Sequence, residues 1–190
     1  MTTSAELDAI IGAVDDFSPF SPRRLAFISL IAAFEADLFD LARLALQRGF
    51  VKLASKFDRT AKIQFSEIEV YSSLDEMRDG VVDAKLDQAT ITTVLSFIKS
   101  CNMPCVDTSA GYSFGHILEL IARRNAHLHN RGRVDDHYLG LRGSTGPCNV
   151  YGFNAGDYTA VDETYAQKAR ALCQYCIDKV AAWVDTLPPA

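Results

Sequence analysis

The segment 121–139, IARRNAHLHNRGRVDDHYL, holds four arginines and three histidines in a chain whose formal net charge is −5. A guanidinium group can hold two phosphate oxygens in a fixed fork, and an imidazole can give or take a proton near neutral pH. Together these groups could bind a phosphate ester and move protons at it. The segment is therefore the first place in this sequence to look for chemistry.

The helical period of 3.6 residues divides the polar residues of this region into two groups. A helix predicted over 112–129 has an apolar arc that comprises Phe114, Ile117, Leu118, Ile121, Ala122 and Leu128. Arg124, Asn125 and His129 fall on the same arc, where polar side chains are unusual. The opposite side, which we expect to be solvated, carries His116, Glu119, Arg123 and His127. Replacing Arg123 or His127 should then leave any activity largely intact.

Glu35 is the one charged residue in the middle of an apolar stripe on the first long predicted helix. A charge on such a face is costly unless it is paired or faces a cleft. A Glu35–Arg124 pair would satisfy both unusual charges, and it could be purely structural or could orient the arginine. Asn125 and His129 could likewise satisfy backbone groups near the helix end. The residue types leave a structural and a functional role open for all four residues.

Arg124 and Asn125, followed after three residues by His129, resemble the signature of the HEPN superfamily, the higher eukaryotes and prokaryotes nucleotide-binding domains. In that signature an arginine is followed by four to six residues and a histidine, and a polar residue, often asparagine, comes directly after the arginine. The continuation HNRGRVDDHYL is also similar to prokaryotic members. The helix that carries Glu35 is similar to the acidic helix that packs against the motif helix in such proteins. The long glycine-rich segment after Leu139 departs from a minimal four-helix member.

The resemblance implies a metal-independent endoribonuclease that needs no cofactor and acts as a homodimer, with one composite active site between two motif helices. RNA cleavage by attack of its own 2′-hydroxyl needs a base, an acid and positive charge beside the phosphorane. His129 would carry the proton, as base or as acid, and Arg124 would hold the phosphate. Asn125 would position the phosphate or hold His129 in its working tautomer, and Glu35 would support the arginine.

Three residues after the motif would contact RNA. Arg131 and Arg133 would bind phosphates, although solvated arginines are common on protein surfaces. Tyr138 could stack on a base, or it could simply pack beside Val134 and Leu139. A protein of this kind would be a toxin–antitoxin or antiviral-defence effector, with an antitoxin or regulatory protein as a further partner. The alternatives are a non-catalytic HEPN module that binds a nucleotide or a partner protein, and a helical interaction domain unrelated to nucleic acid.

Helices must position these residues. Ser21 and Pro22 form a typical helix start and Gly49 a typical stop, and two apolar stripes on this helix suggest that one side meets a partner subunit. Further helices are expected within 72–86, within 87–102, over 112–129 and over 162–187. We predict an all-α fold, an up-and-down bundle of four to five helices that forms a single HEPN-like domain over 1–190. An irregular glycine-rich insertion at about 131–160 precedes the last helix, and 138–139 and 158–160 could pair there as a short hairpin.

The composition restricts the class of protein. A pI near 5.3 argues against a surface that grips long nucleic acid by charge, so any nucleic-acid site must be local. The chain has no apolar run long enough to span a bilayer, and its acidic start lacks the pattern of a signal peptide. His127 and His129 point apart on a helix, and Cys173 and Cys176 fit buried reduced thiols better than a zinc site. We therefore expect a cytoplasmic protein without a metal site and without membrane contact.

Overall fold

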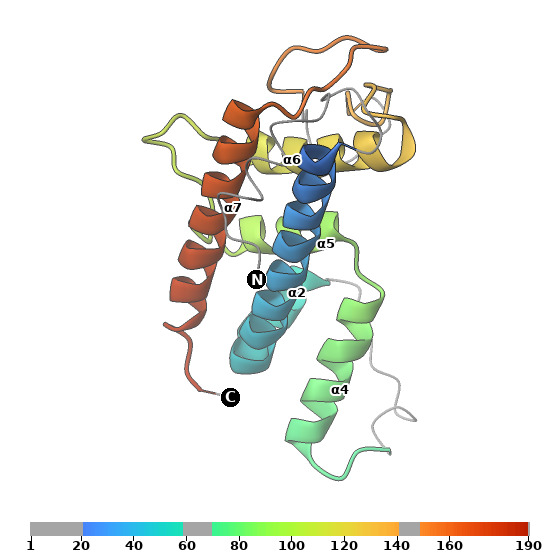
Figure 1. The fold of residues 1–190 in the computed structure, drawn as a ribbon. Helices are drawn as coiled ribbons and strands as arrows, with labels where there is room; N and C mark the ends of the chain where they lie inside the picture. Colours follow the sequence, from blue (N-terminus) through green and yellow to red (C-terminus); the bar gives the residue numbers. More distant parts are fainter. Residues whose placement is uncertain (1–20, 59–69, 141–148, 190) are drawn as a thin grey trace, which may run out of the picture. The chain divides into compact units, whose positions relative to one another are not determined.

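The computed structural model describes residues 21–58, 70–140 and 149–189. These ranges contain the helices α2 (Pro22–Phe57), α4 (Leu74–Asp87), α5 (Ile91–Ser100), α6 (Phe114–His129) and α7 (Glu163–Val184), shown in Figure 1. The predicted all-α class is confirmed. In the part of the chain that the structure describes, strand-like pairing is limited to an isolated antiparallel bridge between Arg133 and Tyr158. None of the helices in these ranges combines the length and the hydropathy that crossing a bilayer requires.

Local signals in the sequence account for the helix boundaries. α2 begins at Pro22, as predicted, because the fixed φ of proline and its missing N–H suit the first helical turn. Gly49 has non-helical torsions (φ −112°, ψ 23°), but the helix resumes after it and continues to Phe57. The predicted stop at Gly49 is therefore a kink. α4 follows Ser73, whose side chain accepts a hydrogen bond from the backbone N–H of Glu76 and so caps the helix.

The ends of α6 are defined by its own side chains and by two residues that follow it. At the start, the backbone N–H of Ser113 donates to Nδ1 of His116 at 2.9 Å, so this histidine is half-buried in a capping contact rather than free in solvent. At the end, Asn130 is the C-cap, and Gly132 takes a left-handed φ of 77°. The N–H of Gly132 donates to the carbonyl oxygen of Ala126 at 2.9 Å. Asn130 and Gly132 thus end the helix, as predicted.

The chain groups into two compact units whose boundaries fall inside α2, after Phe34, and inside α7, after Tyr175. The first unit comprises Met1–Phe34 and Val106–Tyr175, and the second comprises Glu35–Cys105 and Cys176–Ala190. The organisation of 1–190 as a single domain stays a prediction.

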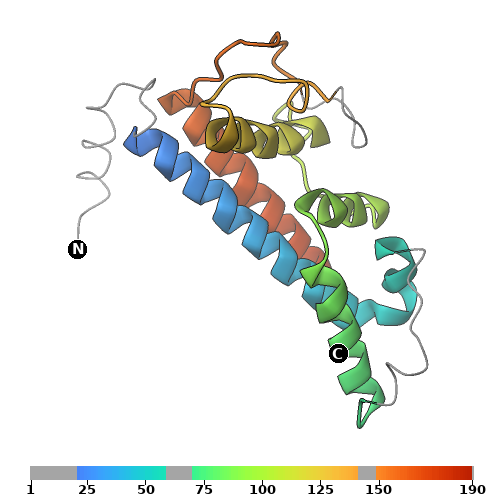
Figure 2. The same ribbon diagram turned by 90° about the vertical axis from the view of Figure 1, so that its right-hand side faces the viewer.

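In the first unit, α6 lies against the first turns of α2 and of α7, as both ribbon views show (Figures 1 and 2). The buried side chains of the first unit include Phe27, Ile31, Phe34, Ile117, Leu120, Ile121, Tyr138, Val161 and Tyr165. Phe27 and Phe34 belong to the second apolar stripe of α2, and each is only 2% exposed. These two side chains are therefore already covered within the chain, without a partner subunit.

The segment between α6 and α7 pairs with Tyr158 through Arg133 and not through the predicted residues 138–139. The bridge joins Arg133 to Tyr158, and Val134 donates to the carbonyl oxygen of Asp157 at 2.9 Å. Tyr138, which was expected at the start of the first hairpin strand, is 1% exposed because its hydroxyl is drawn to a buried carboxylate. The predicted pairing through 138–139 is therefore wrong. Residues 141–148 of the predicted insertion lie outside the described residues.

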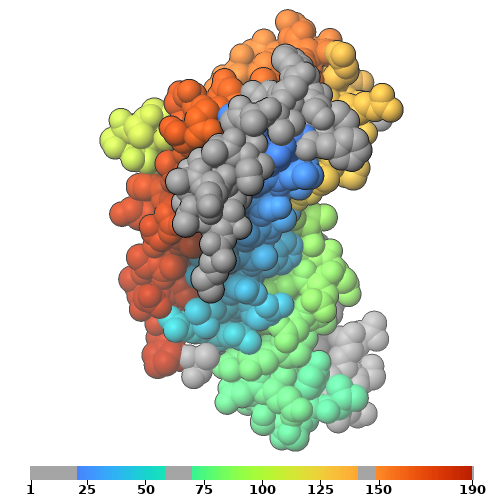
Figure 3. All heavy atoms as spheres, viewed as in Figure 1, coloured from blue at the N-terminus to red at the C-terminus, as the bar shows by residue number. Residues whose placement is uncertain are grey.

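In the second unit, α4 and α5 pack with the second part of α2 and the end of α7. Its buried side chains include Leu38, Ala42, Leu46, Val82, Leu86, Val94, Leu95, Phe97, Ile98, Val180 and Val184. An ion pair between Arg43 and Asp83 at 2.8 Å joins α2 to α4 at the surface, and Figure 3 shows the side chains of these two helices in contact. Across both units, Cys101, Cys105, Cys173 and Cys176 are buried, and none of these four is in a disulfide.

Candidate functional site

The side chains of α6 do not divide between core and solvent as the helical period suggested. Every residue from Ile117 to Arg123 is buried, and towards the C-terminus burial narrows to Ala126 and His127. Leu128, which was expected in the core, is 46% exposed. The expectation that Glu119, Arg123 and His127 are solvated is wrong, because the segment 149–162 and the start of α7 cover that side of the helix.

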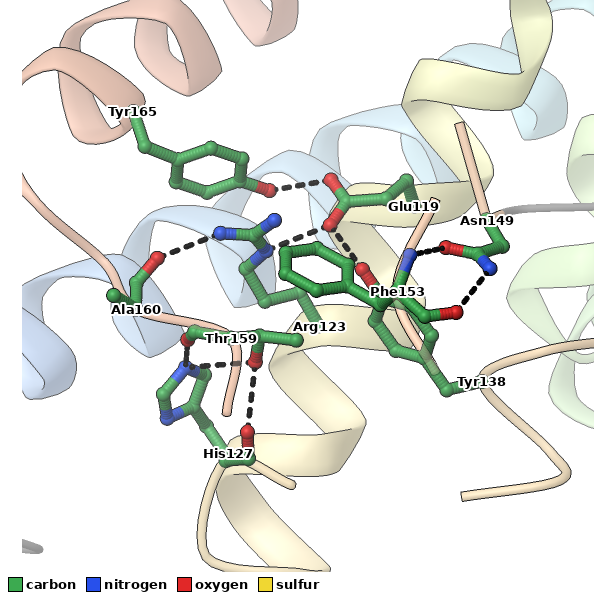
Figure 4. A network of polar contacts seen from close by, with 10 residues as sticks. Glu119, Arg123, His127, Tyr138, Asn149, Phe153, Thr159, Ala160 and Tyr165 are labelled. Carbon is green, nitrogen blue, oxygen red and sulfur yellow. Dashed lines mark hydrogen bonds and ion pairs between the residues drawn. The ribbon is translucent and has the colours of Figure 1, made fainter. Parts of the chain in front are cut away.

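Glu119 is the centre of a buried polar network (Figure 4). Its side chain is fully buried and its carboxylate accepts three hydrogen bonds of 2.6 Å, from Nε of Arg123 and from the hydroxyl groups of Tyr138 and Tyr165. The guanidinium of Arg123 also donates to the carbonyl oxygen of Ala160 at 2.6 Å. A buried ion pair is tolerated only when further hydrogen bonds complete it, and these contacts do so.

Aromatic rings enclose the cation of this network. The Cζ atom of Arg123 lies 3.7 Å from the ring centroid of Tyr165 and 5.4 Å from those of Tyr151 and Phe153. Burial, and after it the charge of Glu119, raises the pKa of the Tyr165 hydroxyl well above its ordinary value. Tyr165 therefore stays a hydrogen-bond donor, as the geometry requires. The network holds the segment before α7 against α6 and leaves no group free to react.

His127 is a second buried polar group on the same side of α6. Its Nε2 lies 2.7 Å from the carbonyl oxygen of Thr159, so Nε2 carries the proton and donates it. Nδ1 is buried and has no hydrogen-bond partner. Burial, and to a smaller extent the charges of Arg24 and Arg123, lower the pKa of His127 to about 4. Arg24 also donates to the backbone carbonyl oxygen of His127. His127 is therefore a neutral structural donor.

The three motif residues lie on the other side of α6 from this network. Arg124 and Asn125 are half-buried, and His129 is exposed in the last turn. Nη1 of Arg124 donates to Oδ1 of Asn125 at 3.0 Å. Because helical neighbours four residues apart share a face, Arg124 lies on the same face as Leu128, and Asn125 on the same face as His129. This end of the helix therefore presents an arginine, an amide and an imidazole together with one exposed leucine.

The supporting residues have different positions. Glu35 is half-buried on α2, in the second unit, and its pairing with Arg124 stays a prediction. Arg131 and Arg133 are exposed in the turn after α6, and Arg133 donates from Nη1 to the carbonyl oxygen of Gly156 at 2.9 Å. Tyr138 is 1% exposed and bonded to Glu119, so its ring cannot stack on a base in this conformation. Of the two roles considered for Tyr138, the structure favours packing.

The geometry therefore separates two groups of residues that the sequence places side by side. Arg124, Asn125 and His129 are accessible in whole or in part and could bind a phosphate and exchange a proton. Glu119 and Arg123 are buried and fully engaged, and sequence reasoning missed their pairing. One signal was available, since a glutamate and an arginine four residues apart on a helix commonly pair. In the described ranges, no three or more histidine, cysteine, aspartate or glutamate side chains come together as a metal site would require.

The chain matches no family model, no curated protein and no solved structure among those with which it was compared. The resemblance to the HEPN superfamily thus depends on the motif residues, and the function depends on what their geometry can do.

Proposed function

We propose that the protein is a metal-independent endoribonuclease of HEPN type, with Arg124, Asn125 and His129 at its active site. The observation that supports this most is the difference in solvent exposure between the two sides of α6. The arginine and histidine that fit the motif lie at accessible or half-buried positions, while the adjacent Arg123 and His127 are buried in structural contacts. A motif produced by chance would not be expected to select the accessible member of each pair.

The proposed reaction is attack of an RNA 2′-oxygen on the adjacent phosphorus. The P–O5′ bond breaks, and the products are a 2′,3′-cyclic phosphate and a 5′-hydroxyl. One group must take the 2′-hydroxyl proton and another must give a proton to the leaving 5′-oxygen. His129 is suited to either transfer because its imidazole is exposed at the helix end. Arg124 would stabilise the charge on the phosphorane, and Asn125, which accepts a hydrogen bond from Arg124, would hold that guanidinium in place.

A homodimer would complete this site. One chain offers a single histidine on the accessible end of α6, whereas the reaction needs both a base and an acid. A second copy would bring a second His129, and Leu128, which is 46% exposed beside it, offers apolar surface for such a contact. A ribonuclease must be controlled in its own cell, which fits a toxin–antitoxin or antiviral-defence effector held in check by a partner protein.

The test is cleavage of single-stranded RNA by the purified protein in excess EDTA, with detection of the cyclic phosphate end. Arg124→Ala and His129→Ala should each lower the rate by at least about 100-fold, since positioned acid–base groups and oxyanion donors contribute on this scale. Arg170→Ala, which changes an exposed arginine of α7 away from the motif, should cleave normally. Absence of cleavage by the wild type, or cleavage that survives His129→Ala, would exclude this mechanism.

Arg123 and His127 are unsuitable as controls, although the sequence suggested them. Both are buried, at 3% and 1% exposure, and both hold the segment before α7. Replacing either residue should change the structure around the site, so a loss of activity would not identify a catalytic group.

A further inference from the structure

The turn 130–134, which carries Arg131 and Arg133, is attached to the segment 156–160 by a continuous set of backbone contacts. Val134 donates to the carbonyl oxygen of Asp157 at 2.9 Å, and Gly156 donates to that of Val134 at 2.9 Å. The guanidinium of Arg133 is itself held by the carbonyl oxygen of Gly156. The place of the turn relative to α6 therefore depends on what holds the segment 156–160, in addition to the bond from Gly132 to Ala126 at the helix end.

Thr159 joins this segment both to α6 and to the turn. Its carbonyl oxygen accepts from Nε2 of His127 at 2.7 Å. Its backbone N–H and its hydroxyl both donate to the carbonyl oxygen of Gly132, at 2.8 and 3.0 Å. Thr159 is fully buried and His127 is 1% exposed, so water does not compete for these bonds. A chain of contacts thus runs from α6 through His127 and Thr159 to the centre of the turn.

The turn also packs directly on the imidazole. A Cβ atom placed on Gly132 would lie 2.8 Å from Cε1 of His127 and 2.6 Å from Cε2 of Tyr158. The rings of His127 and Tyr158 meet edge to face with centroids 5.8 Å apart. Next to this glycine, Arg131 takes a left-handed φ of 52°, which a residue with a side chain adopts only when its surroundings require it. The turn therefore packs against the imidazole ring of His127 at Gly132.

We propose that His127 and Thr159 are positioning residues that hold Arg131 and Arg133 beside His129, so that the two arginines can bind RNA phosphates. This inference rests on the proposed function. His127 contributes to RNA affinity through the turn and takes no part in proton transfer, because it is buried and its proton-bearing nitrogen is engaged by Thr159.

Kinetics on single-stranded RNA separate this role from a catalytic one. His127→Leu keeps most of the bulk but removes the hydrogen bond to Thr159, and it should raise KM about tenfold while kcat changes by less than about threefold. His127→Gln places an amide donor near the position of Nε2 and should restore KM to within about threefold of the wild type. Thr159→Val is a milder second variant, because it keeps the backbone bonds and removes only the hydroxyl, which donates to Gly132 and lies 3.5 Å from Nε2 of His127. Arg170→Ala on α7 is the exposed control.

Binding measured in an inactive His129→Ala background shows whether the effect passes through the arginines. Each phosphate contact to a single strand contributes about 0.7 to the slope of log affinity against log salt. His127→Leu should lower this slope by about 1 to 1.5, as the double change Arg131→Ala and Arg133→Ala should. Combining all three changes should add little to either alone. A fall in kcat at unchanged KM, or fully additive losses of affinity, would overturn the proposal.

Amide hydrogen exchange tests the positioning without RNA. In His127→Leu the amides of Gly132 and Val134 should exchange at least about tenfold faster, while those of Leu120 and Ile121 inside α6 should keep their protection. Unchanged exchange in the turn would overturn the proposal even if the wild type cleaves RNA. Faster exchange in a protein that binds no RNA would reject the proposed function, and with it the role of this turn in binding RNA, while the structural contact would stand.

Discussion

Replacing Glu119 with glutamine should strongly destabilise the fold, although it exchanges one oxygen atom of the side chain for an amide nitrogen. Glu119 is fully buried and all three of its partners are donors, namely Arg123, Tyr138 and Tyr165. Glutamine keeps the shape and one acceptor oxygen, but its amide places a donor against these donors and removes the charge that Arg123 requires.

The size of the effect follows from what Arg123 retains. Removing one partner of a buried ion pair costs about 3 to 5 kcal/mol, because the remaining charge stays buried without its counterion. In Glu119→Gln the guanidinium of Arg123 would keep its hydrogen bond to Ala160 and its contact with the face of Tyr165. Cation–π contacts of this kind contribute about 1 to 2 kcal/mol when desolvated, so we expect the lower end of the range, about 3 kcal/mol.

Urea denaturation followed by far-UV circular dichroism measures this difference. The double change Glu119→Gln with Arg123→Met removes the stranded cation as well, and it should be less destabilising than Glu119→Gln alone. The matched control is Asp83→Asn, which breaks the Arg43–Asp83 pair at 54% and 36% side-chain exposure on Asp83 and Arg43. That change should cost less than about 1 kcal/mol because the pair is solvated.

The reasoning is refuted if Glu119→Gln lowers the free energy of unfolding by less than about 1 kcal/mol with an unchanged denaturant slope. It is also refuted if the double variant loses as much stability, relative to the wild type, as the two single variants lose when their losses are added. Either result would mean that burial, rather than the ion pair, supplies what this network contributes.

Two further predictions concern His127 and the turn that rests on it. Burial lowers the folded-state pKa of His127 from its ordinary 6.5 to about 4, so between these values the unfolded chain binds the proton more readily than the folded one. Stability should therefore fall on acidification through this window by about 3 kcal/mol, and urea titrations at several pH values should show a weaker pH dependence in His127→Gln. Gly132→Ala should cost at least about 2 kcal/mol more in thermal or urea unfolding than Gly111→Ala. Both glycines have positive φ, 77° for Gly132 and 79° for Gly111, but a methyl group on Gly111 would meet nothing within 4 Å. Equal losses of stability in the two variants would mean that the contact between residue 132 and the His127 ring is unimportant.

The helices of this protein are predictable from its sequence because their causes are local. Pro22 starts α2, Ser73 caps α4, and Asn130 with Gly132 ends α6. Each signal acts within one or two turns of the chain, so it works in whatever tertiary structure surrounds it. Gly49 shows the limit of such signals, since a glycine that could end a helix only kinks this one.

The sequence also separated Arg124, Asn125 and His129 from Arg123 and His127, but it predicted burial for the wrong group. The period of α6 separates Arg124, Asn125 and His129 from the other two residues by angle alone. The same period cannot tell which side is dry, because that depends on which other part of the chain packs there. The apolar arc indicated burial for the motif side, whereas in the structure this side is the more accessible one.

Only the tertiary structure decided which side of α6 is buried, and the physical reason is sequence separation. The contacts that bury Glu119, Arg123 and His127 come from Tyr165, Ala160 and Thr159, which are 46, 37 and 32 residues away along the chain. No local pattern in the glycine-rich segment before α7 predicts that it will cover Glu119 and His127. The sequence by itself determined the start of α2, the end of α6 and the separation of the polar residues of α6 into two groups. The long-range hydrogen bonds of the segment before α7 determined which group is buried and which stays accessible.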